Sequence, residues 1–479
     1  MDGGVDMSTP FSLVTSFSTW LKSPLRQILG ICFCILCGAL VAFLPREAVF
    51  PFIIFVLGLS FGIICISQYE KPEALVLLTI FLSAYLIRAL LSVIFYLLSF
   101  AYQDELHLGF LFLNDGYAYH EDAFRMVKMK EFGFDPIIYG VSFWSTGRPI
   151  APVPYEFWNC FVYGFTGKSP LSMFLLNSFL GALTVLVLYD LIRLFFWRQA
   201  ALRASWIYAL WPSLILWSTQ NLKDPMIICS LTLFVSSVLI SFKRPTILRV
   251  SFLIASGTVL FKIQKFFFLV VMVSTILAVL LTLATHKRRW VRLGMLCLLL
   301  GFLLMMAPAH LLNLGTLTKL QNSFIQYLWR EHETFLQSQF ETLNALRKVR
   351  AQGGSAFLVN INLASPLRLL MYLPILLAYA CLGPFPWQAF GFFKLFGAAE
   401  MLVFYFFIPA FFRGVRFVLK EKKPTALLLL NVIFVVMTSV ALLDSNLGTA
   451  VRHRASVLPL IFTFIAVGWH KQKKVSTLD

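Results

Sequence analysis

The sequence predicts an all-α, polytopic integral membrane protein. Of its 479 residues, 59% are hydrophobic and only 13% are charged, and the mean hydropathy is +0.81. Soluble globular proteins carry roughly 25% charged residues, so too few polar side chains remain here to cover a water-soluble body of this size. The apolar residues form long unbroken runs, whereas transmembrane β-strands show short alternating segments. Helices that cross a bilayer are therefore expected.

Apolar runs follow one another along the chain, and two longer polar stretches, 102–170 and 314–366, interrupt them. The expected membrane segments are 27–45, 48–68, 74–101, 171–192, 204–219, 225–242, 248–262, 266–285, 293–313, 367–383, 389–412, 424–443 and 455–469. Four prolines lie in or beside 367–383, which favours a re-entrant or broken helix there. The sequence thus predicts about 12 to 13 membrane helices. Alternatively, 367–383 crosses the membrane fully and a further crossing has been missed elsewhere in the chain.

The net charge of +18 comes mainly from basic residues in short loops between apolar runs. The clusters lie at 193–203, 243–249, 287–292, 413–423 and 471–474. The positive-inside rule places all five in the cytoplasm, so both long polar stretches are expected on the outer face. This distribution argues against a nucleic-acid partner. The eight cysteines include no CxxC pair and are interpreted as small hydrophobic residues.

The first outer stretch contains the richest polar cluster of the chain, from Asn114 to Ala123. Only 22 residues are acidic, and Asp115, Glu121 and Asp122 all lie here. One interpretation is a solvated loop with ordinary carboxylates. The other is a catalytic site, because a carboxylate at a membrane face can act as a general base when desolvation raises its pKa. Residues 123–132 have the spacing of an amphipathic interfacial helix.

The spacing Asp115-x3-Tyr119-x3-Ala123 resembles the pattern that opens the first outer loop of GT-C superfamily glycosyltransferases. These are multi-spanning enzymes that use lipid-linked sugar donors. The stretch from Arg148 to Tyr155 is similar to the Arg-Pro-Pro-x-Tyr stretch of their protein O-mannosyltransferase and aminoarabinose transferase branch. The resemblance implies a GT-C-like fold.

Further motifs continue this resemblance over roughly residues 75–290. The stretch 164–189 is similar to the family's next helix, and 211–218 followed by Lys223-Asp224 is similar to its proline-serine motif and second acidic residue. One departure is Gly116, where the family often has an acidic residue directly after the first aspartate. That departure counts against a metal site of the oligosaccharyltransferase type.

The resemblance implies Asp115 as the general base and Asp224 as a second catalytic carboxylate. It implies substrate contacts for a further group of residues in the same region: Tyr119, Glu121, Asp122, Arg148, Tyr155 and Lys223. A structural interpretation of Asp224 stays open beside the catalytic one, since an aspartate before Pro225 is a good helix cap.

The last outer loop, 444–454, carries Arg452, His453 and Arg454 on a face where basic residues are unusual. Pairing with Asp444 or with a lipid headgroup is one explanation. The other is binding of an anionic substrate such as a lipid phosphate, which Arg binds in a bidentate manner. Loops of the type Asn-x-Gly-Thr-x-x-Arg-x-Arg also resemble those of bacterial polysaccharide polymerases.

The outer stretch 314–366 is expected to form one or two amphipathic helices followed by a glycine turn. Its Lys348 and Arg350 are interpreted as a solvated face in preference to lipid-phosphate ligands. His120 and His453 lack any metal-ligand spacing, so no obligatory metal cofactor is expected, and a divalent cation is left open. Three parts are predicted: a two-helix extension (1–73), a GT-C-like catalytic core (74–290) and a C-terminal region (291–479).

The leading hypothesis is a membrane glycosyltransferase. It would move a sugar from a polyprenyl-phosphate-linked donor to a glycan, lipid or protein acceptor, with inversion, at the periplasmic or extracellular face of the cytoplasmic (inner) membrane. The first alternative is a polysaccharide polymerase or ligase that acts on lipid-linked oligosaccharides. The second is a transporter or flippase for lipid-linked glycans, which would need several charged residues within its membrane helices. Membrane lipids are expected partners in every case.

Overall fold

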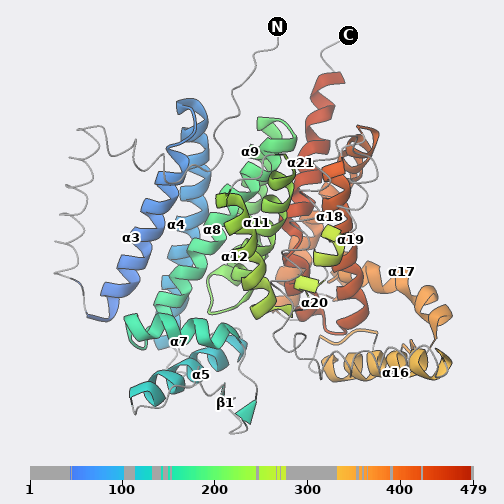
Figure 1. Cartoon of the computed structure of the whole chain (residues 1–479), viewed down its shortest axis with the longest axis horizontal. Helices are drawn as coiled ribbons and strands as arrows, with labels where there is room; N and C mark the ends of the chain where they lie inside the picture. Colours follow the sequence, from blue (N-terminus) through green and yellow to red (C-terminus); the bar gives the residue numbers. More distant parts are fainter. Residues whose placement is uncertain are drawn as a thin grey trace. The chain divides into compact units, whose positions relative to one another are not determined.

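The computed structural model describes residues 44, 46–101, 114–131, 142–143, 149–150, 154–243, 247–265, 267–269, 271–276, 332–351, 355–358, 361–363, 365–388, 392–421 and 424–475 (Figure 1). Regular structure in this part of the chain is helical, apart from one short antiparallel pair. That pair joins β1 (Ser142–Phe143) to β2 (Pro149–Ile150), with Ser142 opposite Ile150. The predicted all-α class is confirmed with this small exception.

Five of the described helices are long and apolar enough to cross a membrane, by length and composition. They are α3 (Arg46–Ile66), α4 (Lys71–Ala101), α8 (Pro170–Phe195), α11 (Asp224–Lys243) and α18 (Phe392–Lys420). A sixth span arises if α20 (Leu447–Ala455) and α21 (Leu458–Val475), bent by 65°, count as one. The chain is thus a multi-pass α-helical membrane protein. The predicted segments 27–45 and 293–313 lie outside the described residues, so the full count of crossings stays a prediction.

The chain packs as two compact units, Met1–Ser236 and Ser237–Asp479. In the first unit, α8 lies at the centre: α3, α4 and α9 (Arg198–Ala209) all pack against it. The most apolar stretch of α8 is 72% buried, whereas the corresponding stretches of α3 and α4 are only 28% and 39% buried. The predicted division into 1–73, 74–290 and 291–479 stays a prediction.

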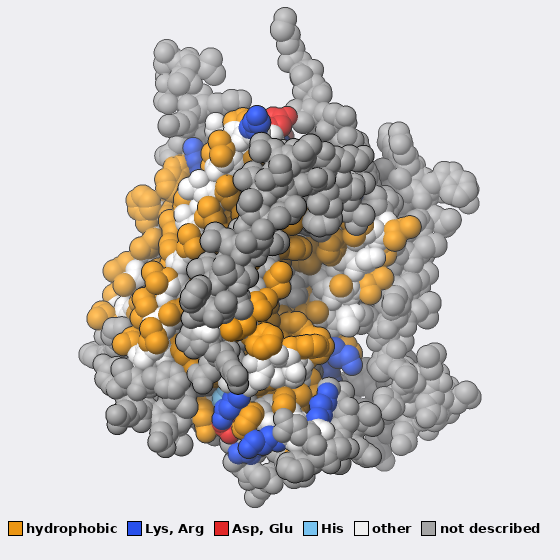
Figure 2. All heavy atoms as spheres, turned by 90° about the vertical axis from the view of Figure 1, so that its left-hand side faces the viewer, with side chains coloured by type: hydrophobic (Ala, Val, Ile, Leu, Met, Phe, Trp, Pro, Cys, Tyr) orange, Lys and Arg blue, Asp and Glu red, His pale blue; other side chains and the backbone are white. Residues whose placement is uncertain are grey.

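Hydrophobic side chains cover the face formed by α3 and α4 (Figure 2). Leu57 on α3 and Leu75, Leu90 and Leu97 on α4 are each about 60% exposed. Among the side chains coloured in Figure 2, charged groups lie only towards the upper and lower ends of this face. A broad apolar surface with charged ends is what a lipid-facing helix pair requires, because hydrocarbon cannot solvate charges.

The segment 204–219 does not form one crossing, so that prediction is wrong. The chain breaks after α9 and resumes as the seven-residue α10 (Pro212–Ser218). Trp211 between them is extended, with φ −72° and ψ 121°. The reason is local: Pro212 disfavours a helical conformation in the residue before it and is itself well suited to begin a helix.

A buried arginine joins α4 to this break. Arg88 is 0% exposed, its Nε donates to the Ser218 hydroxyl (2.9 Å), and its Nη1 donates to the Ala209 carbonyl (2.8 Å). The guanidinium therefore caps the end of α9, where helix carbonyls lack intrahelical partners. Gly181 of α8 leaves room for it, since a Cβ there would lie 2.9 Å from Arg88 Nε.

The polar stretch 102–170 contains two described helices, α5 (Asn114–Glu131) and α7 (Pro154–Thr166), which pack against each other at the lower end of the first unit in Figure 1. The amphipathic helix predicted for 123–132 therefore starts nine residues earlier and includes Asp115. Helix α5 presents Tyr119, Ala123 and Met126 to α7 at a spacing of three to four residues, and these side chains are buried.

The second unit holds the remaining helices. They are α12 (Ile247–Ile263), α16 (His332–Arg350), α17 (Pro366–Leu382), the single 3-10 turn η1 (Pro386–Gln388), α18, α19 (Pro424–Leu443), α20 and α21. Helix α16 confirms one helix in the outer stretch 314–366. The prediction of a broken helix at 367–383 is wrong, since α17 runs through Pro374 without interruption. Whether α17 crosses or re-enters stays a prediction.

Two boundaries in this unit differ from those expected. Helix α18 continues to Lys420, so Arg413 and Arg416 lie on a helix and not in a short loop. The loop 444–454 is largely helical as well, and Asn446 caps α20 through the Gly448 amide (2.9 Å). Helices α18 and α21 cross very closely: a Cβ on Gly414 or on Gly468 would lie 1.9 Å from a carbonyl oxygen of the other helix.

Candidate functional site

The first candidate site lies at the first turn of α5, where Asp115 is exposed. One turn later, Tyr119 is buried and packs edge to face on Tyr155 of α7, with ring centroids 5.1 Å apart. Packing of aromatic rings fixes both side chains and gives α5 a defined position on α7. Asp115 thus lies at the first turn of α5, and packing fixes that helix one turn later.

A hydrogen-bond network links this turn to a distant segment. The Tyr155 hydroxyl donates to Asn221 Oδ1 (3.1 Å) and accepts from Asn177 Nδ2 (3.1 Å). Asn221 Nδ2 in turn donates to the Gly116 carbonyl (3.4 Å), and Asn177 Nδ2 donates to the carbonyls of residues 220 and 222 (2.7 and 2.9 Å). The three side chains are fully buried. They connect α5, α7, α8 and the turn between α10 and α11.

This network brings the two segments that carry Asp115 and Asp224 together. Gly116 follows Asp115 directly, and Asp224 begins α11 three residues after Asn221. Asp224 is only 5% exposed, and Lys223 beside it is half-buried. Both predicted catalytic carboxylates therefore belong to one polar cluster of the first unit.

His120 points into the packing between α5 and α7. Its Nδ1 lies 2.7 Å from the Tyr163 hydroxyl, and the two rings meet edge to face. Burial lowers the pKa of His120 to about 3, and the positive charge of Lys168 acts in the same direction. The imidazole is accordingly neutral at physiological pH.

Asp122 is the most unusual of the predicted substrate-binding residues. It is 1% exposed, and neither of its carboxylate oxygens has a hydrogen-bond partner among the described residues. Burial raises its pKa to about 6; the nearby Arg125 lowers it and Glu121 raises it further. Burial without hydrogen-bond partners favours the protonated form of this carboxyl group, which agrees with the direction of the shift.

Glu121 and Lys168 form an ion pair on the outer side of this cluster, with 3.7 Å between Lys168 Nζ and the Glu121 carboxylate. The same ammonium lies 4.1 Å from the centre of the Phe124 ring. Both charged side chains keep solvent contact, so the pair adds little stability. Arg148 lies outside the described residues, and its predicted role stays a prediction.

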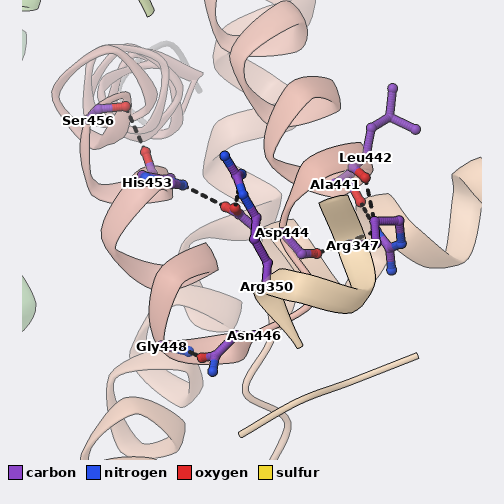
Figure 3. A network of polar contacts seen from close by, with 9 residues as sticks. All are labelled: Arg347, Arg350, Ala441, Leu442, Asp444, Asn446, Gly448, His453 and Ser456. Carbon is purple, nitrogen blue, oxygen red and sulfur yellow. Dashed lines mark hydrogen bonds and ion pairs between the residues drawn. The ribbon is translucent and has the colours of Figure 1, made fainter. Parts of the chain in front are cut away.

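The second candidate site lies in the second unit, around Asp444 (Figure 3). Asp444 is fully buried, its Oδ1 accepts from Arg350 Nη1 of α16 (3.0 Å), and its Oδ2 lies 2.6 Å from His453 Nδ1 of α20. The interpretation of Arg350 as part of a solvated face is therefore incomplete, since its guanidinium pairs with Asp444. For His453, the pairing with Asp444 that the sequence left open is present.

Arg454 serves a different purpose from the one expected of a phosphate ligand. It is 3% exposed, and its Nη1 donates to the carbonyls of Gly383 (2.7 Å) and Cys381 (3.1 Å) at the end of α17. These contacts favour a structural role, because the guanidinium satisfies carbonyls that end a helix. Arg452 is half-exposed on the same short helix.

A small cavity of about 30 Å³ adjoins Asp444. It is lined by Gln264, Phe267, Arg350, Ser439, Val440, Leu443, Asp444 and His453, all in the second unit. Phe267 packs edge to face on the His453 ring, with centroids 5.6 Å apart.

Among the described residues, no group of three or more His, Cys, Asp and Glu side chains is arranged to hold a metal ion.

No protein-family model and no curated protein matches the chain. Among solved structures, the chain is similar to the crystal structure of the Archaeoglobus fulgidus oligosaccharyltransferase in the apo form, with 13% sequence identity and a TM-score of 0.45. The likeness covers 83% of this chain and 52% of that enzyme, so the chain spans about half of its length.

Proposed function

We propose that this protein is a membrane glycosyltransferase that uses a polyprenyl-phosphate-linked sugar donor, with Asp115 as the general base. The observation that carries the proposal is the hydrogen bond from Asn221 to Gly116, which ties the first turn of α5 to the segment of Asp224. Two carboxylates and Lys223 are thereby gathered at one end of a helical membrane unit. Acid–base groups at the end of a membrane bundle suit a reaction between a lipid-borne donor and a water-borne acceptor.

In the proposed reaction, Asp115 takes the proton of an acceptor hydroxyl. The hydroxyl oxygen attacks the anomeric carbon, the bond from that carbon to the phosphate oxygen breaks, and its electron pair leaves with the lipid phosphate. Attack from the face opposite to the leaving group inverts the anomeric configuration. A cation such as Lys223 stabilises the negative charge of the leaving phosphate.

The apolar face of α3 and α4 supports the lipid part of this proposal. A polyprenyl chain stays in the hydrocarbon layer, so its phosphate must reach the site from the side of the bundle. The exposed leucines on α4 run along the helix that leads towards the first outer stretch. The active site then lies on the periplasmic or extracellular side, because the positive-inside rule assigns the basic loops to the cytoplasm.

Replacement of Asp115 by Asn tests the proposal in a transfer assay with purified protein and radiolabelled lipid-linked sugar. A positioned general base contributes roughly 10²- to 10⁴-fold to the rate, so D115N should lose at least about 10²-fold in kcat. Glu70→Gln is the matched control: Glu70 is an exposed carboxylate at the other end of α4, and E70Q should transfer sugar like the wild type. Turnover of D115N equal to that of E70Q would remove Asp115 from the reaction.

Asp224→Asn in the same assay assigns the second carboxylate. A loss in kcat with unchanged KM indicates a contact made in the transition state, whereas a rise in KM alone indicates donor binding. The length of the product distinguishes a single-sugar transferase from a polysaccharide polymerase, which would extend the acceptor repeatedly.

A further inference from the structure

The charged network around Asp444 engages one ring nitrogen of His453. Its Nδ1 lies 2.6 Å from the carboxylate of Asp444 and donates to it, since a carboxylate only accepts. The other ring nitrogen, Nε2, is not used in this contact. Phe267 packs edge-on to the ring and holds its orientation. His453 thus lines the cavity with its ring held in place.

Arg350 provides donors at the same wall. One Nη1 hydrogen is used on Asp444, and the guanidinium, whose side chain is 41% exposed, carries four further N–H groups. Gln264 adds an amide to the lining. A volume of about 30 Å³ has room for one or two water-sized groups, which is the size of one or two hydroxyls.

Contacts outside this network also hold the turn at Asp444 in place. Arg347, one turn earlier on α16, donates to the carbonyls of Ala441 (3.1 Å) and Leu442 (3.0 Å), which end α19 (Figure 3). Backbone hydrogen bonds from Phe357 to Ser445 (2.8 Å) and from residue 447 to residue 355 (2.9 Å) fix the next residues. The buried Arg347 therefore fastens α16 to the turn, and Arg350 and His453 are left with partly exposed groups that line a cavity.

We propose that Arg350, Asp444 and His453 form a subsite that binds a sugar hydroxyl of a substrate. The hydroxyl forms a hydrogen bond with His453 Nε2, and its oxygen accepts another from the Arg350 guanidinium. Asp444 positions both partners. Paired donors and acceptors recognise hydroxyls selectively, since a ligand that lacks the hydroxyl leaves them unpaired. That the ligand is a sugar rests on the proposed function, whereas the placement of Arg350 and His453 at the cavity does not.

Saturation-transfer NMR on the full-length protein in detergent tests this subsite without a lipid-linked donor. The probes are the methyl pyranosides of glucose, galactose, mannose and N-acetylglucosamine. At least one should receive saturation from the wild type. R350Q should weaken its binding about ten-fold or more, as expected for loss of a hydrogen bond to a charged group, and H453Q should weaken it by about two-fold to ten-fold, as expected for loss of an ordinary hydrogen bond. Asp444→Asn should also weaken binding of the probe, because it loosens the His453 ring.

Lys348→Gln is the matched control, because Lys348 is an exposed cation on the same helix two residues before Arg350. K348Q should bind the probe like the wild type. Should D444N fail to fold, the half-exposed His453 and Arg350 still decide the question. Equal binding by wild type, H453Q and R350Q overturns the proposal, and so does a wild type that binds none of the four probes. A protein that binds a probe but transfers no sugar retains the subsite and loses only the glycosyltransferase proposal.

Discussion

Removal of the Tyr155 hydroxyl is the sharpest structural test of the first candidate site. In Tyr155→Phe the ring and its contact with Tyr119 remain, and only the hydroxyl is lost. Asn177 keeps two acceptors for its amide, the carbonyls of residues 220 and 222. Asn221 Oδ1, in contrast, loses the one donor that the described residues give it, and Asn221 is fully buried. One buried acceptor is therefore left unsatisfied.

An unsatisfied buried polar group costs about 1–3 kcal/mol, and we expect Y155F to lower the stability of the first unit by that amount. For a unit of this size, the change corresponds to a Tm lower by roughly 2 to 12 °C. Thermal unfolding in detergent measures it. The control is Tyr372→Phe, since Tyr372 is 38% exposed on α17 and its hydroxyl should contribute within about 0.5 kcal/mol.

A double-mutant cycle with Asn221→Ala shows whether the loss arises from this hydrogen bond. In the N221A background, Y155F should cost little, giving a coupling energy of about 1 kcal/mol or more. The reasoning is refuted if Y155F melts like Y372F, or if its cost is the same with and without Asn221.

The remaining predictions concern two buried titratable groups and two glycines. His120, with its pKa lowered to about 3, stays neutral while the unfolded chain takes up a proton, so its contribution to stability is lost as the pH falls from 6.5 towards 3. Asp122, with its pKa raised to about 6 from 3.8, acts in the opposite sense: its contribution is lost as the pH rises from about 4 through 6. In profiles of Tm against pH, H120Q should lose the fall in Tm towards low pH and keep the one that Asp122 causes towards pH 6. D122N should show the reverse. Identical profiles for both variants and the wild type would contradict these two pKa shifts. Gly468→Ala should lower the Tm strongly, because its Cβ would lie 1.9 Å from a carbonyl oxygen of α18. Gly164→Ala should instead raise stability by about 0.5–1 kcal/mol, since nothing lies within 4 Å of its Cβ on α7; equal effects of the two substitutions would rule out a close crossing of α18 and α21.

The membrane helices were predictable because hydropathy is a local property. The runs near α3, α4, α8 and α11 are long, apolar and bounded by charged or turn-forming residues, so each is visible in a window of about 20 residues. The prediction of a single crossing at 204–219 was wrong, although the sequence contains the signal for a break. Pro212 lies in the middle of that run, and the restriction that proline places on Trp211 predicts a break there.

The candidate site was predictable only in part, because its contacts join residues far apart in the chain. The carboxylates of α5 stood out by their scarcity. The partners of Tyr155 did not: Asn221 is 66 residues away, and Asn177 is hidden in an apolar run. A buried asparagine in a membrane helix is costly, so Asn177 was the available signal. Arg454 shows the opposite case, since its sequence context resembles that of a phosphate ligand while its guanidinium donates to backbone carbonyls.

The buried Arg88 also constrains how the protein is made. Helix α4 leaves the ribosome well before α9 and α10, and the two groups that Arg88 binds there come 121 and 130 residues later. Until they arrive, an arginine in the middle of a membrane helix costs roughly 2.5–3.5 kcal/mol on the insertion scale, which the leucine-rich remainder of α4 must outweigh. When α4 enters the bilayer, Arg88 therefore has only the Ala84 carbonyl of its own helix within reach, and its contacts with Ser218 and Ala209 form later. Substitution of Ser218, or of the residues around Trp211, should therefore first increase degradation of the newly made chain, before any loss of catalysis.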